Sequence, residues 1–330
     1  MTRTLIVGGT GFLGSAIAAR AAAQGDVVSI LTRGQASAPQ EVAAIVADRF
    51  GPLTALLGQS FDLVFDTCAY IPDAVTHLMR VLQPQRYVMI SSVSVHDRFD
   101  RPDLTEDSPV PEATESDFAP YRAKPFAEWG RVPVLPESYG RLKRSCELAA
   151  QAVMGERAIL LRPGLIVGAG DRSDRLTWWA RRLDQGGRIP VPNDRPVQCI
   201  DVRDVADFAV KLAGNGGSGV YNATSLPFAL FRLLETLQDL SGTPSSLVPL
   251  PDRAFLDAGV GPWKNLPLWL PDDPDHAHFF GITTARARAA GLTTRPLAQT
   301  LAGLLDWDRT RRAIPLATGL TADQERRLLG

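Results

Sequence analysis

The feature that most constrains the fold is a glycine-rich turn close to the N-terminus, Gly8-Gly9-Thr10-Gly11-Phe12-Leu13-Gly14. It follows a short β-branched run at residues 4–7 and opens an alanine-rich stretch of helical composition at residues 12–24. In such a turn Gly8 permits the tight bend, Gly11 lets the backbone approach a pyrophosphate, and Gly14 allows close packing of helix on strand. The free N–H groups at the start of the helix can then bind the anion. The pattern predicts a dinucleotide-binding unit rather than a simple turn.

Short apolar runs that alternate with helix-compatible segments continue through the first half of the chain. The runs lie at residues 27–31, 44–47, 63–65, 87–90 and 158–161, and the helical segments lie near residues 52–58, 72–83 and 138–153. Short strands that are wholly apolar and alternate with helices are typical of a parallel sheet covered on both faces. With right-handed crossovers, this predicts an α/β fold with a doubly wound parallel sheet.

Two regions depart from the alternation. Residues 97–137 are rich in proline and acidic residues and have no apolar periodicity, so we expect either disorder or a lid. From about residue 166 the alternation weakens, and tryptophan and proline become frequent. We therefore predict a dinucleotide-binding domain at residues 1–165 with a return segment near 196–222, a lid-like insertion at 97–137, and a smaller C-terminal substrate-binding lobe at 166–330.

Composition limits the partners that such a chain would bind. Its 330 residues carry a formal net charge of −1, which gives no reason to expect nucleic acid or an anionic membrane as a partner. The three cysteines lie far apart, and no apolar run approaches the ~20 residues of a membrane span. The N-terminus runs directly into a strand without a signal-peptide pattern. We expect a cytoplasmic monomer or homodimer that acts on a small molecule.

The residues after the second apolar run bear on the cofactor. Sites for NAD place an acidic residue there, which accepts hydrogen bonds from the ribose hydroxyls. This chain has Thr32-Arg33-Gly34 instead, and an arginine suits the 2′-phosphate of NADP. We predict NADP(H) in preference to NAD(H), the alternative being that Arg33 is a solvated surface side chain. After the third run, Asp48 could accept from the adenine amino group.

The second motif is Tyr139-Gly140-Arg141-Leu142-Lys143. On a helix, the spacing of four places the phenol and the ammonium one turn apart on the same face. A nearby positive charge lowers the pKa of a tyrosine, which can then exchange a proton with a substrate hydroxyl or carbonyl. The chain has only four lysines, and Tyr139 is the only tyrosine with a lysine four residues later. We predict an acid–base pair, with an inert surface pair as the alternative.

The third motif is Ser91-Ser92-Val93-Ser94-Val95, which ends the fifth predicted strand. Hydroxyls at the carboxyl end of a parallel strand lie at the edge of the sheet where ligands bind. A serine there can hydrogen-bond the reacting oxygen of a substrate. The residues alone do not decide which of the three serines does so.

Taken together, these motifs resemble the extended short-chain dehydrogenase/reductase family, also called the NAD-dependent epimerase/dehydratase family. The resemblance spans nearly the whole chain and includes LRPGLIVGAGD at 161–171 and QCIDVRDVA at 198–206. It implies that Ser92 orients the substrate oxygen, that Tyr139 is the acid–base and that Lys143 is its partner. It also implies that Arg162-Pro163-Gly164 line the nicotinamide end, and that residues 195–204 contribute to the substrate wall.

The predicted site is thus a set of three catalytic residues with a cofactor cleft and a substrate wall around them. The catalytic residues are Ser92, Tyr139 and Lys143. The cofactor-binding residues are Gly8, Thr10, Gly11, Phe12, Leu13, Gly14, Arg33, Asp48, Cys68, Ala69, Lys143, Arg162, Pro163 and Gly164. The substrate-binding residues are Ser94, His96, Trp178 and Gln198.

Some residues depart from the family's usual pattern. The chain reads Asp66-Thr67-Cys68-Ala69-Tyr70 after the fourth strand, where many members have an alanine pair, and His96-Asp97 where sugar-nucleotide enzymes usually have tyrosine-glycine. Val93-Ser94 replace the acidic pair of the 4,6-dehydratases, which argues against dehydration. The closest branch resembles chloroplast stem-loop-binding proteins and bacterial reductases, some of which bind RNA.

Several other residues give weaker indications of function than these motifs. His276 and His278 lie in a proline-bearing loop without a third spaced ligand, so we predict no metal site. His96 is either a substrate contact or a loop histidine without a role, and Cys68 is interpreted as a packing thiol. The arginine-rich stretch at 172–188, which contains Trp178 and Trp179, fits an amphipathic covering helix, with contact to an anionic substrate as the alternative.

The sequence therefore predicts reduction of a carbonyl or oxidation of an alcohol on a small or medium-sized metabolite with NADP(H). One alternative is a nucleotide-sugar epimerase, which would retain its cofactor instead of consuming it. Another is a nucleotide- or RNA-binding protein of the same fold without turnover. The Ser–Tyr–Lys set and the near-neutral charge argue against that last alternative.

Overall fold

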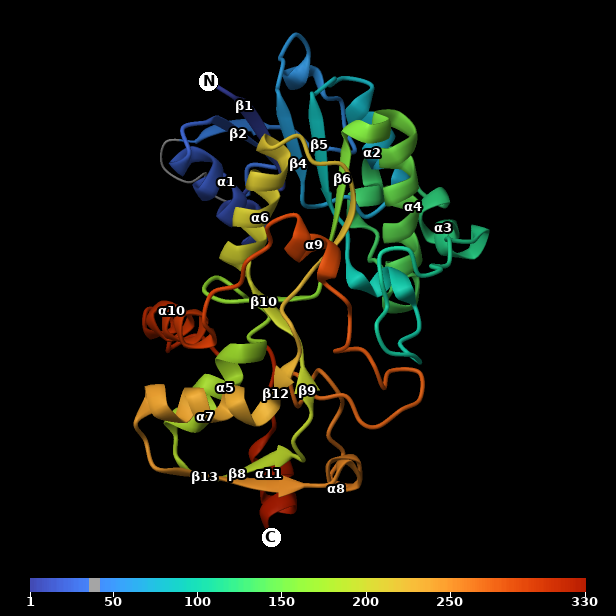
Figure 1. Cartoon of the computed structure of the whole chain (residues 1–330). Coiled ribbons are helices and arrows are strands. Elements are labelled where there is room, and N and C mark those ends of the chain that lie inside the picture. The colour runs from blue at the N-terminus through green and yellow to red at the C-terminus, as the bar shows by residue number, and fades with distance from the viewer. Residues whose placement is uncertain (36–41) are drawn as a thin grey trace.

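Seven parallel strands form the central sheet of the computed structural model, which describes residues 1–35 and 42–330 (Figure 1). The strand order is β11-β6-β5-β4-β1-β2-β3, and every neighbouring pair is parallel. The order runs outward in both directions from β1, so the predicted doubly wound α/β fold is confirmed. The strands are β1 (Arg3–Val7), β2 (Val27–Thr32), β3 (Ala43–Val46), β4 (Leu63–Asp66), β5 (Arg86–Ile90), β6 (Ala158–Pro163) and β11 (Gly219–Ala223).

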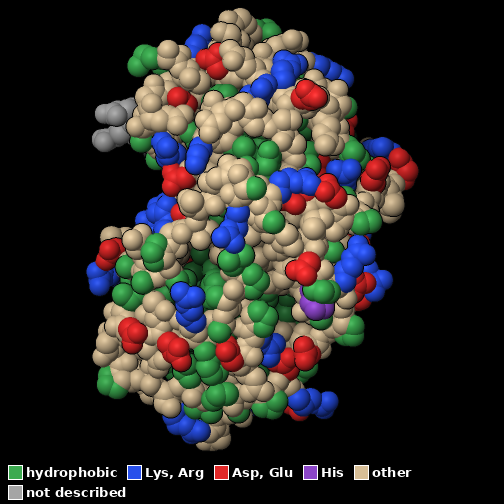
Figure 2. All heavy atoms as spheres, viewed as in Figure 1, with side chains coloured by type: hydrophobic (Ala, Val, Ile, Leu, Met, Phe, Trp, Pro, Cys, Tyr) green, Lys and Arg blue, Asp and Glu red, His purple; other side chains and the backbone are tan. Residues whose placement is uncertain are grey.

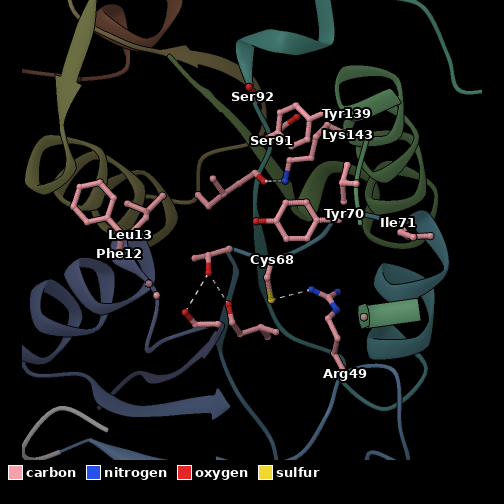
Figure 3. Close-up of a pocket in the computed structure, with 18 of the residues that line it drawn as sticks. Phe12, Leu13, Arg49, Cys68, Tyr70, Ile71, Ser91, Ser92, Tyr139 and Lys143 are labelled. Carbon is pink, nitrogen blue, oxygen red and sulfur yellow. Dashed lines mark hydrogen bonds between the residues drawn. The ribbon is translucent and has the colours of Figure 1, made fainter. Parts of the chain in front are cut away.

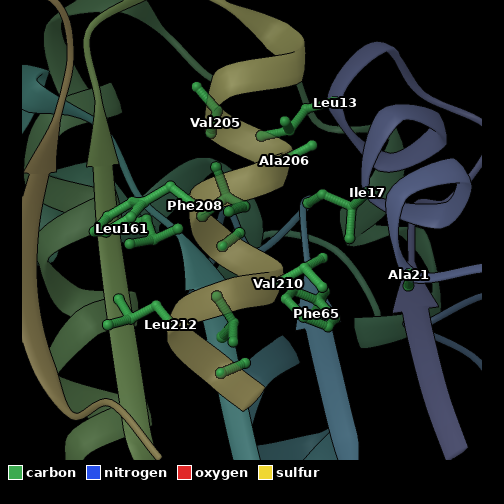
Figure 4. Close-up of a cluster of buried hydrophobic side chains, with 14 of the residues drawn as sticks. Leu13, Ile17, Ala21, Phe65, Leu161, Val205, Ala206, Phe208, Val210 and Leu212 are labelled. Carbon is green, nitrogen blue, oxygen red and sulfur yellow. The ribbon is translucent and has the colours of Figure 1, made fainter. Parts of the chain in front are cut away.

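Alternate side chains of each strand enter different cores, because successive residues of a strand point to opposite faces. On β1, Ile6 belongs to the core that includes α1 (Phe12–Ala23) and α6 (Val202–Gly214). Figure 4 shows Leu13 and Ile17 of α1 pointing toward α6 in this core. Its neighbours Leu5 and Val7 pack on the other face, against α2 (Pro72–Met79) and α4 (Pro136–Met154). Each aliphatic or aromatic side chain buried in these two layers contributes about 1.5–3 kcal/mol. This is why the strands read as continuous apolar runs.

The predicted helices differ from the observed ones in one place. The segment expected to be helical near residues 52–58 contains only a single 3₁₀ turn, Thr54–Leu56. Gly58 there has a φ of +75°, which a continuing helix could not accommodate. The expected helices at 72–83 and 138–153 are present as α2 and α4, with ends shifted by a few residues.

The chain returns to the sheet after it has entered the second lobe. Helix α6 packs on α1, and β11 becomes the edge strand beside β6. These elements lie within and just after the return segment expected near 196–222. A further return, which the sequence did not predict, places α9 (Ala285–Ala289) against β11 and buries Ala287 and Leu292 in the same core.

The C-terminal lobe has a core of its own, below the sheet in Figure 1. Three of its helices pack on one another: α5 (Arg175–Asp184), α7 (Leu230–Ser241) and α10 (Leu297–Arg309). The remaining elements are β7 (Leu165–Val167) paired with β10 (Cys199–Asp201), β8 (Gly187–Pro192) with β13 (Ser245–Leu250), β9 (Pro196–Val197) with β12 (Phe228–Ala229), and the helices α8 (Asp252–Asp257) and α11 (Ala322–Leu329).

The insertion at 97–137 is more regular than its composition suggests. It forms the helix α3 (Glu115–Arg122) and a 3₁₀ helix at Phe126–Arg131. The N-terminus of α3 is capped by the Asp117 carboxylate, which accepts from the backbone N–H of Thr114 at 2.8 Å. Pro120 lies inside this helix of eight residues, and so short an element leaves little periodicity to detect.

The visible surface carries acidic and basic side chains interspersed over both lobes, without a large patch of one sign (Figure 2). Among the helices of residues 1–35 and 42–330, none has the length and apolar character needed to cross a bilayer.

Candidate active site

A cavity of about 1110 Å³ lies at the carboxyl ends of the central strands, where the two lobes meet. Its wall combines residues from the glycine turn, the ends of β1, β2, β4, β5 and β6, the helix α4, the insertion and the C-terminal lobe. In open parallel sheets, ligands bind at this edge, where the strand order reverses. The cavity is therefore the natural place to look for a cofactor and a substrate together.

The glycine turn has the geometry of a phosphate cradle. Gly8 has a φ of +81°, and a Cβ on Gly14 would lie 2.2 Å from the carbonyl oxygen of Gly8. The turn can therefore pack this closely on the helix only with glycine at both positions. Helix α1 begins at Phe12 after the N-cap Gly11, and no side chain caps it. Its first residues, Phe12, Leu13 and Gly14, line the cavity, and their N–H groups have no partner within the helix, as an anion site requires.

The far end of the cavity contains the two residues expected to contact the adenosine part of a cofactor. Arg33, just after β2, is exposed and lines the cavity. Asp48, just after β3, also lines it, and one carboxylate oxygen accepts from the backbone N–H of Phe50 at 2.9 Å. The structure thus brings both residues to the same cleft as the glycine turn.

A buried ion pair beneath this cleft was not identified from the sequence. Arg49 donates two hydrogen bonds to Asp66, at 2.7 and 2.8 Å, and a third bond reaches Sγ of Cys68 at 3.3 Å (Figure 3). The hydroxyl of Tyr87 also donates to Asp66, at 2.7 Å. Burial alone would raise the pKa of Asp66, but Arg49 and Tyr87 bring it below its ordinary value. The pair fixes the loop after β4, which forms one side of the cavity.

The predicted catalytic serine and tyrosine lie together in the cavity (Figure 3). Ser92 lies two residues after the end of β5. Its hydroxyl donates to Oγ of Ser94 at 3.0 Å and accepts from the Ser94 N–H at 3.1 Å. Tyr139 enters from the second turn of α4. Burial raises the pKa of Tyr139, and the nearby Ser92 hydroxyl opposes that effect. The phenol therefore carries its proton at neutral pH.

Lys143 lies one turn further along α4 and is almost fully buried. Its ammonium donates to the carbonyl oxygens of Ala69 at 2.8 Å and Ile90 at 2.6 Å. The ring nearest to it is that of Tyr70, whose centroid is 4.9 Å from Nζ. The sequence led us to expect that Lys143 lowers the pKa of Tyr139. In this structure its charge acts on the pKa values of Tyr70, Cys68 and Cys146 instead.

The insertion forms part of the cavity wall and is hydrogen-bonded to α4. Asp117 of α3 accepts from Ser138 at 2.7 Å and from Arg141 at 2.7 and 3.0 Å, so its contacts flank Tyr139 in sequence. Arg141 above all lowers the pKa of Asp117, so the carboxylate is charged over the whole neutral range. The same insertion supplies Tyr121, Trp129, Val132 and Val134 to the cavity wall.

The tether can be tested on its own. We expect Asp117→Asn to lower turnover by more than about fivefold, since a lost hydrogen bond to a charged group costs about 1.5–3 kcal/mol and displaces the start of α4. Hydrogen exchange at residues 110–134 should become faster. Glu115→Gln on the same helix is the control, because Glu115 is exposed and pairs with Arg122 rather than with α4. Equal exchange and turnover in the two variants would contradict the tether.

Five of the predicted site residues, Ala69 among them, do not line the cavity. Arg162 is buried and forms two hydrogen bonds with Glu147, at 2.8 and 2.7 Å, so its side chain serves the fold rather than the nicotinamide end. His96 is buried, and neither ring nitrogen has a partner among the described residues. Burial and then the charge of Arg162 lower the pKa of His96 to about 4, so this ring is neutral at pH 7.

The other two residues lie in or beside the core of the C-terminal lobe. Trp178 packs among its apolar side chains, since the face of α5 that bears it turns inward. Gln198 is buried and bridges backbone groups of Ser225 and Ile282. Of the other predicted residues, Ala69 contributes only its carbonyl to Lys143, whereas Pro163 and Gly164 do line the cavity.

The C-terminal lobe contributes an aromatic wall and two arginines that the sequence analysis did not single out as site residues. Trp263 and Phe279 line the cavity with ring centroids 5.4 Å apart. Arg172 is exposed at the cavity, and Arg175 begins α5 beside it. The only signal for these arginines was the alternative interpretation of the stretch at 172–188. Nothing marked the two aromatics, because they come from irregular segments.

No group of three or more potential metal ligands occurs within residues 1–35 and 42–330. His276 contacts Asp273 on the surface, 2.9 Å from Nδ1 to the carboxylate, and neither residue lines the cavity.

The sequence and the structure were compared with those of known proteins. No protein-family model and no curated protein sequence matches the chain. Solved structures do match. A protein of Burkholderia cenocepacia J2315 described as an epimerase has a TM-score of 0.68 at 19% identity, covering 94% of this chain and 98% of that one. The likeness in fold spans nearly the whole length of both chains.

Two further matches were solved with ligands. The UDP-glucuronic acid 4-epimerase of Bacillus cereus in complex with NAD has a TM-score of 0.65 at 15% identity, covering 93% of this chain and 99% of that one. MoeE5 in complex with UDP-glucuronic acid and NAD has a TM-score of 0.62 at 18% identity, covering 94% and 100%. At these identities the likeness establishes the fold, and the activity must be argued from the site.

Proposed function

We propose that the protein is an NADP(H)-dependent oxidoreductase that interconverts a carbonyl and an alcohol on a small or medium-sized metabolite. The observation that carries the proposal is the convergence of Ser92, Tyr139 and Lys143 with the open N-terminus of α1 on one cavity. The cradle of Gly8 and Gly14 fits a pyrophosphate, because it brings bare backbone to the cavity surface.

Each residue of the site has a defined role in this reaction. When bound, the nicotinamide exchanges a hydride with the reacting carbon. The Ser92 hydroxyl orients the reacting oxygen, and the Tyr139 phenol gives that oxygen its proton or takes it back. Lys143 donates two of its three N–H groups to backbone carbonyls, and the third can donate to a ribose hydroxyl. Since burial keeps Tyr139 protonated, the site favours donation to a carbonyl, which is the direction of reduction.

The proposal is tested by titrating a panel of carbonyl compounds against protein loaded with NADPH and following absorbance at the reduced nicotinamide band. Consumption of NADPH that depends on one class of carbonyl is the expected result. If no compound accelerates its oxidation, reduction of such carbonyls is excluded.

A nucleotide-sugar epimerase is the second candidate. The structural matches to a UDP-glucuronic acid 4-epimerase and to MoeE5 with bound UDP-glucuronic acid favour it. Such an enzyme would interconvert its substrate without net change in the nicotinamide. Epimerised product formed with constant absorbance would therefore identify it. A nucleotide- or RNA-binding role without turnover has less support, since the visible surface has no basic patch.

Arg33 is expected to determine the choice of cofactor. We predict that NADP(H) binds at least roughly tenfold more tightly than NAD(H), because a guanidinium pairs with the 2′-phosphate, and that Arg33→Asp reverses much of this preference. Fluorescence titration of both dinucleotides measures it. Arg172→Asp, an exposed arginine elsewhere on the cavity wall, serves as the control. Equal affinities in the wild-type protein would contradict the assignment.

A further inference from the structure

Tyr70 is a second phenol in the cavity for which the proposed chemistry has no role. It follows β4, it is 39% exposed, and it lines the cavity together with Tyr139. The two rings are 6.5 Å apart between centroids. Figure 3 shows the Tyr70 ring beside Lys143. Tyrosine is intermediate in burial among residue types, so the reason for a ring at this point must come from its neighbours.

The reason lies in the surroundings of Lys143. Its side chain is only 2% exposed, and a buried ammonium is costly unless other groups replace its hydration. The replacements are the carbonyls of Ala69 and Ile90, together with the face of the Tyr70 ring at 4.9 Å. None of these carries a negative charge. An aromatic face at this distance attracts a cation by about 0.5–2 kcal/mol, more where water is excluded.

The loop after β4 therefore makes two different contacts with the lysine ammonium. Ala69 supplies a carbonyl oxygen and the next residue, Tyr70, supplies the ring. The loop is itself held in place by Asp66, which accepts from the N–H of Cys68 at 3.1 Å and forms an ion pair with Arg49. The stretch Asp66-Thr67-Cys68-Ala69-Tyr70 is the one that departs from the alanine pair of many family members. Two of its residues, Ala69 and Tyr70, contact the ammonium.

We infer that Tyr70 is a positioning residue whose aromatic face holds the Lys143 ammonium where it meets the dinucleotide. The inference rests on the proposed function, since it gives Lys143 a role in binding the cofactor. In this role the ring matters and the hydroxyl does not. Tyr70→Phe keeps the ring, whereas Tyr70→Leu fills similar space without an aromatic face.

The expected result is a loss that appears only with leucine. NADPH affinity, measured by fluorescence titration without turnover, should fall roughly two- to thirtyfold in Tyr70→Leu and stay within about twofold of wild type in Tyr70→Phe. Thermal unfolding of both variants checks that each is folded. If phenylalanine weakens binding as much as leucine, the hydroxyl is the working group and the inference is wrong.

A double-mutant cycle separates action through Lys143 from direct contact with the cofactor. Tyr70→Leu should change the affinity little when it is added to Lys143→Met, because the group that it positions is gone. An equal loss in both backgrounds would mean that Tyr70 acts independently, which overturns the inference while the proposed function stands. If the wild-type protein binds neither NADPH nor NADH, the proposed function itself fails.

Discussion

Tyr139→Phe is expected to reduce turnover by about 10²–10⁴ while dinucleotide affinity stays within a few-fold of wild type. Only the phenolic oxygen is removed, and general acid–base catalysis contributes about this much to a rate. The ring stays in place beside Tyr70, so the shape of the cavity should be kept. Steady-state kinetics and a fluorescence titration of NADPH measure the two quantities separately.

The matched control is Tyr221→Phe. The hydroxyl of Tyr221 donates to the carbonyl of Ser218 at 2.8 Å, and the residue does not line the cavity. It should therefore keep nearly full turnover. A Tyr139→Phe protein that retained more than about a third of wild-type activity would remove Tyr139 from the catalytic role, whatever the state of Ser92 and Lys143.

The pH dependence of reduction follows from the protonation of the same phenol. Burial raises the pKa of Tyr139 above that of a free tyrosine. The protonated form, which can donate to a carbonyl, is fully populated below the unperturbed pKa of about 10 and is lost only as the pH rises through the higher folded value. Tyr139 therefore gives no reason for the reduction rate to fall between about pH 6 and 9.

The sequence predicted the parts of the site that depend on neighbours in the chain. The turn at Gly8–Gly14 and the pair Tyr139–Lys143 are set by spacing along one turn or one helix, so local rules suffice for them. The strands were visible because both of their faces are buried and both must be apolar. These features converge on the same edge of the sheet once the topology is known.

The sequence could not predict which way a side chain points when its partner lies on another helix or strand. Arg162 directly precedes Pro163 and Gly164, which do line the cavity, yet its side chain reaches Glu147 on α4. In a strand, neighbouring side chains point to opposite faces, so contact with the cavity at one residue says little about the next. Trp178 poses the same problem on a helix, where the pattern shows an apolar face but not which element covers it.

The residues that were missed are held by contacts distant in sequence. Arg49 lies in the loop after β3 and Asp66 ends β4, so their contact joins residues 17 positions apart in the chain. Tyr70 acquires its partner from α4, which begins more than sixty residues later. Trp263 and Phe279 come from irregular segments of the second lobe, where neither period nor propensity marks a binding residue. Long-range pairing, not local preference, decides these positions.

The contact between Arg162 and Glu147 leads to the last prediction, which concerns stability. Both side chains are at most 1% exposed, and two parallel hydrogen bonds join them. Arg162→Met should lower the free energy of unfolding by about 3–5 kcal/mol, because it leaves a buried carboxylate without its main partner. Urea-induced unfolding measures the loss. Affinity for NADPH should stay within a few-fold, since Arg162 does not line the cavity.

Two comparisons identify the ion pair as the cause of that loss. Arg162→Met combined with Glu147→Leu should regain much of the stability, since a well-packed apolar pair can replace a buried ion pair. Arg253→Met, which breaks an exposed pair with Asp257, should leave the free energy of unfolding nearly unchanged. If Arg162→Met is no more destabilising than this control, the pair does not support the fold.

The same pair fixes the sign of the pH dependence. Burial alone would raise the pKa of Glu147, but the bonds from Arg162 bring it below the ordinary value. A carboxyl group with a lowered folded pKa contributes stability above its unfolded value, about 4.3, and loses that contribution as the pH falls toward the folded value. The stability difference between the wild-type protein and Arg162→Met should therefore be largest near neutral pH and shrink below about pH 4. A difference that stayed constant on acidification would mean that Glu147 is already protonated in the folded protein.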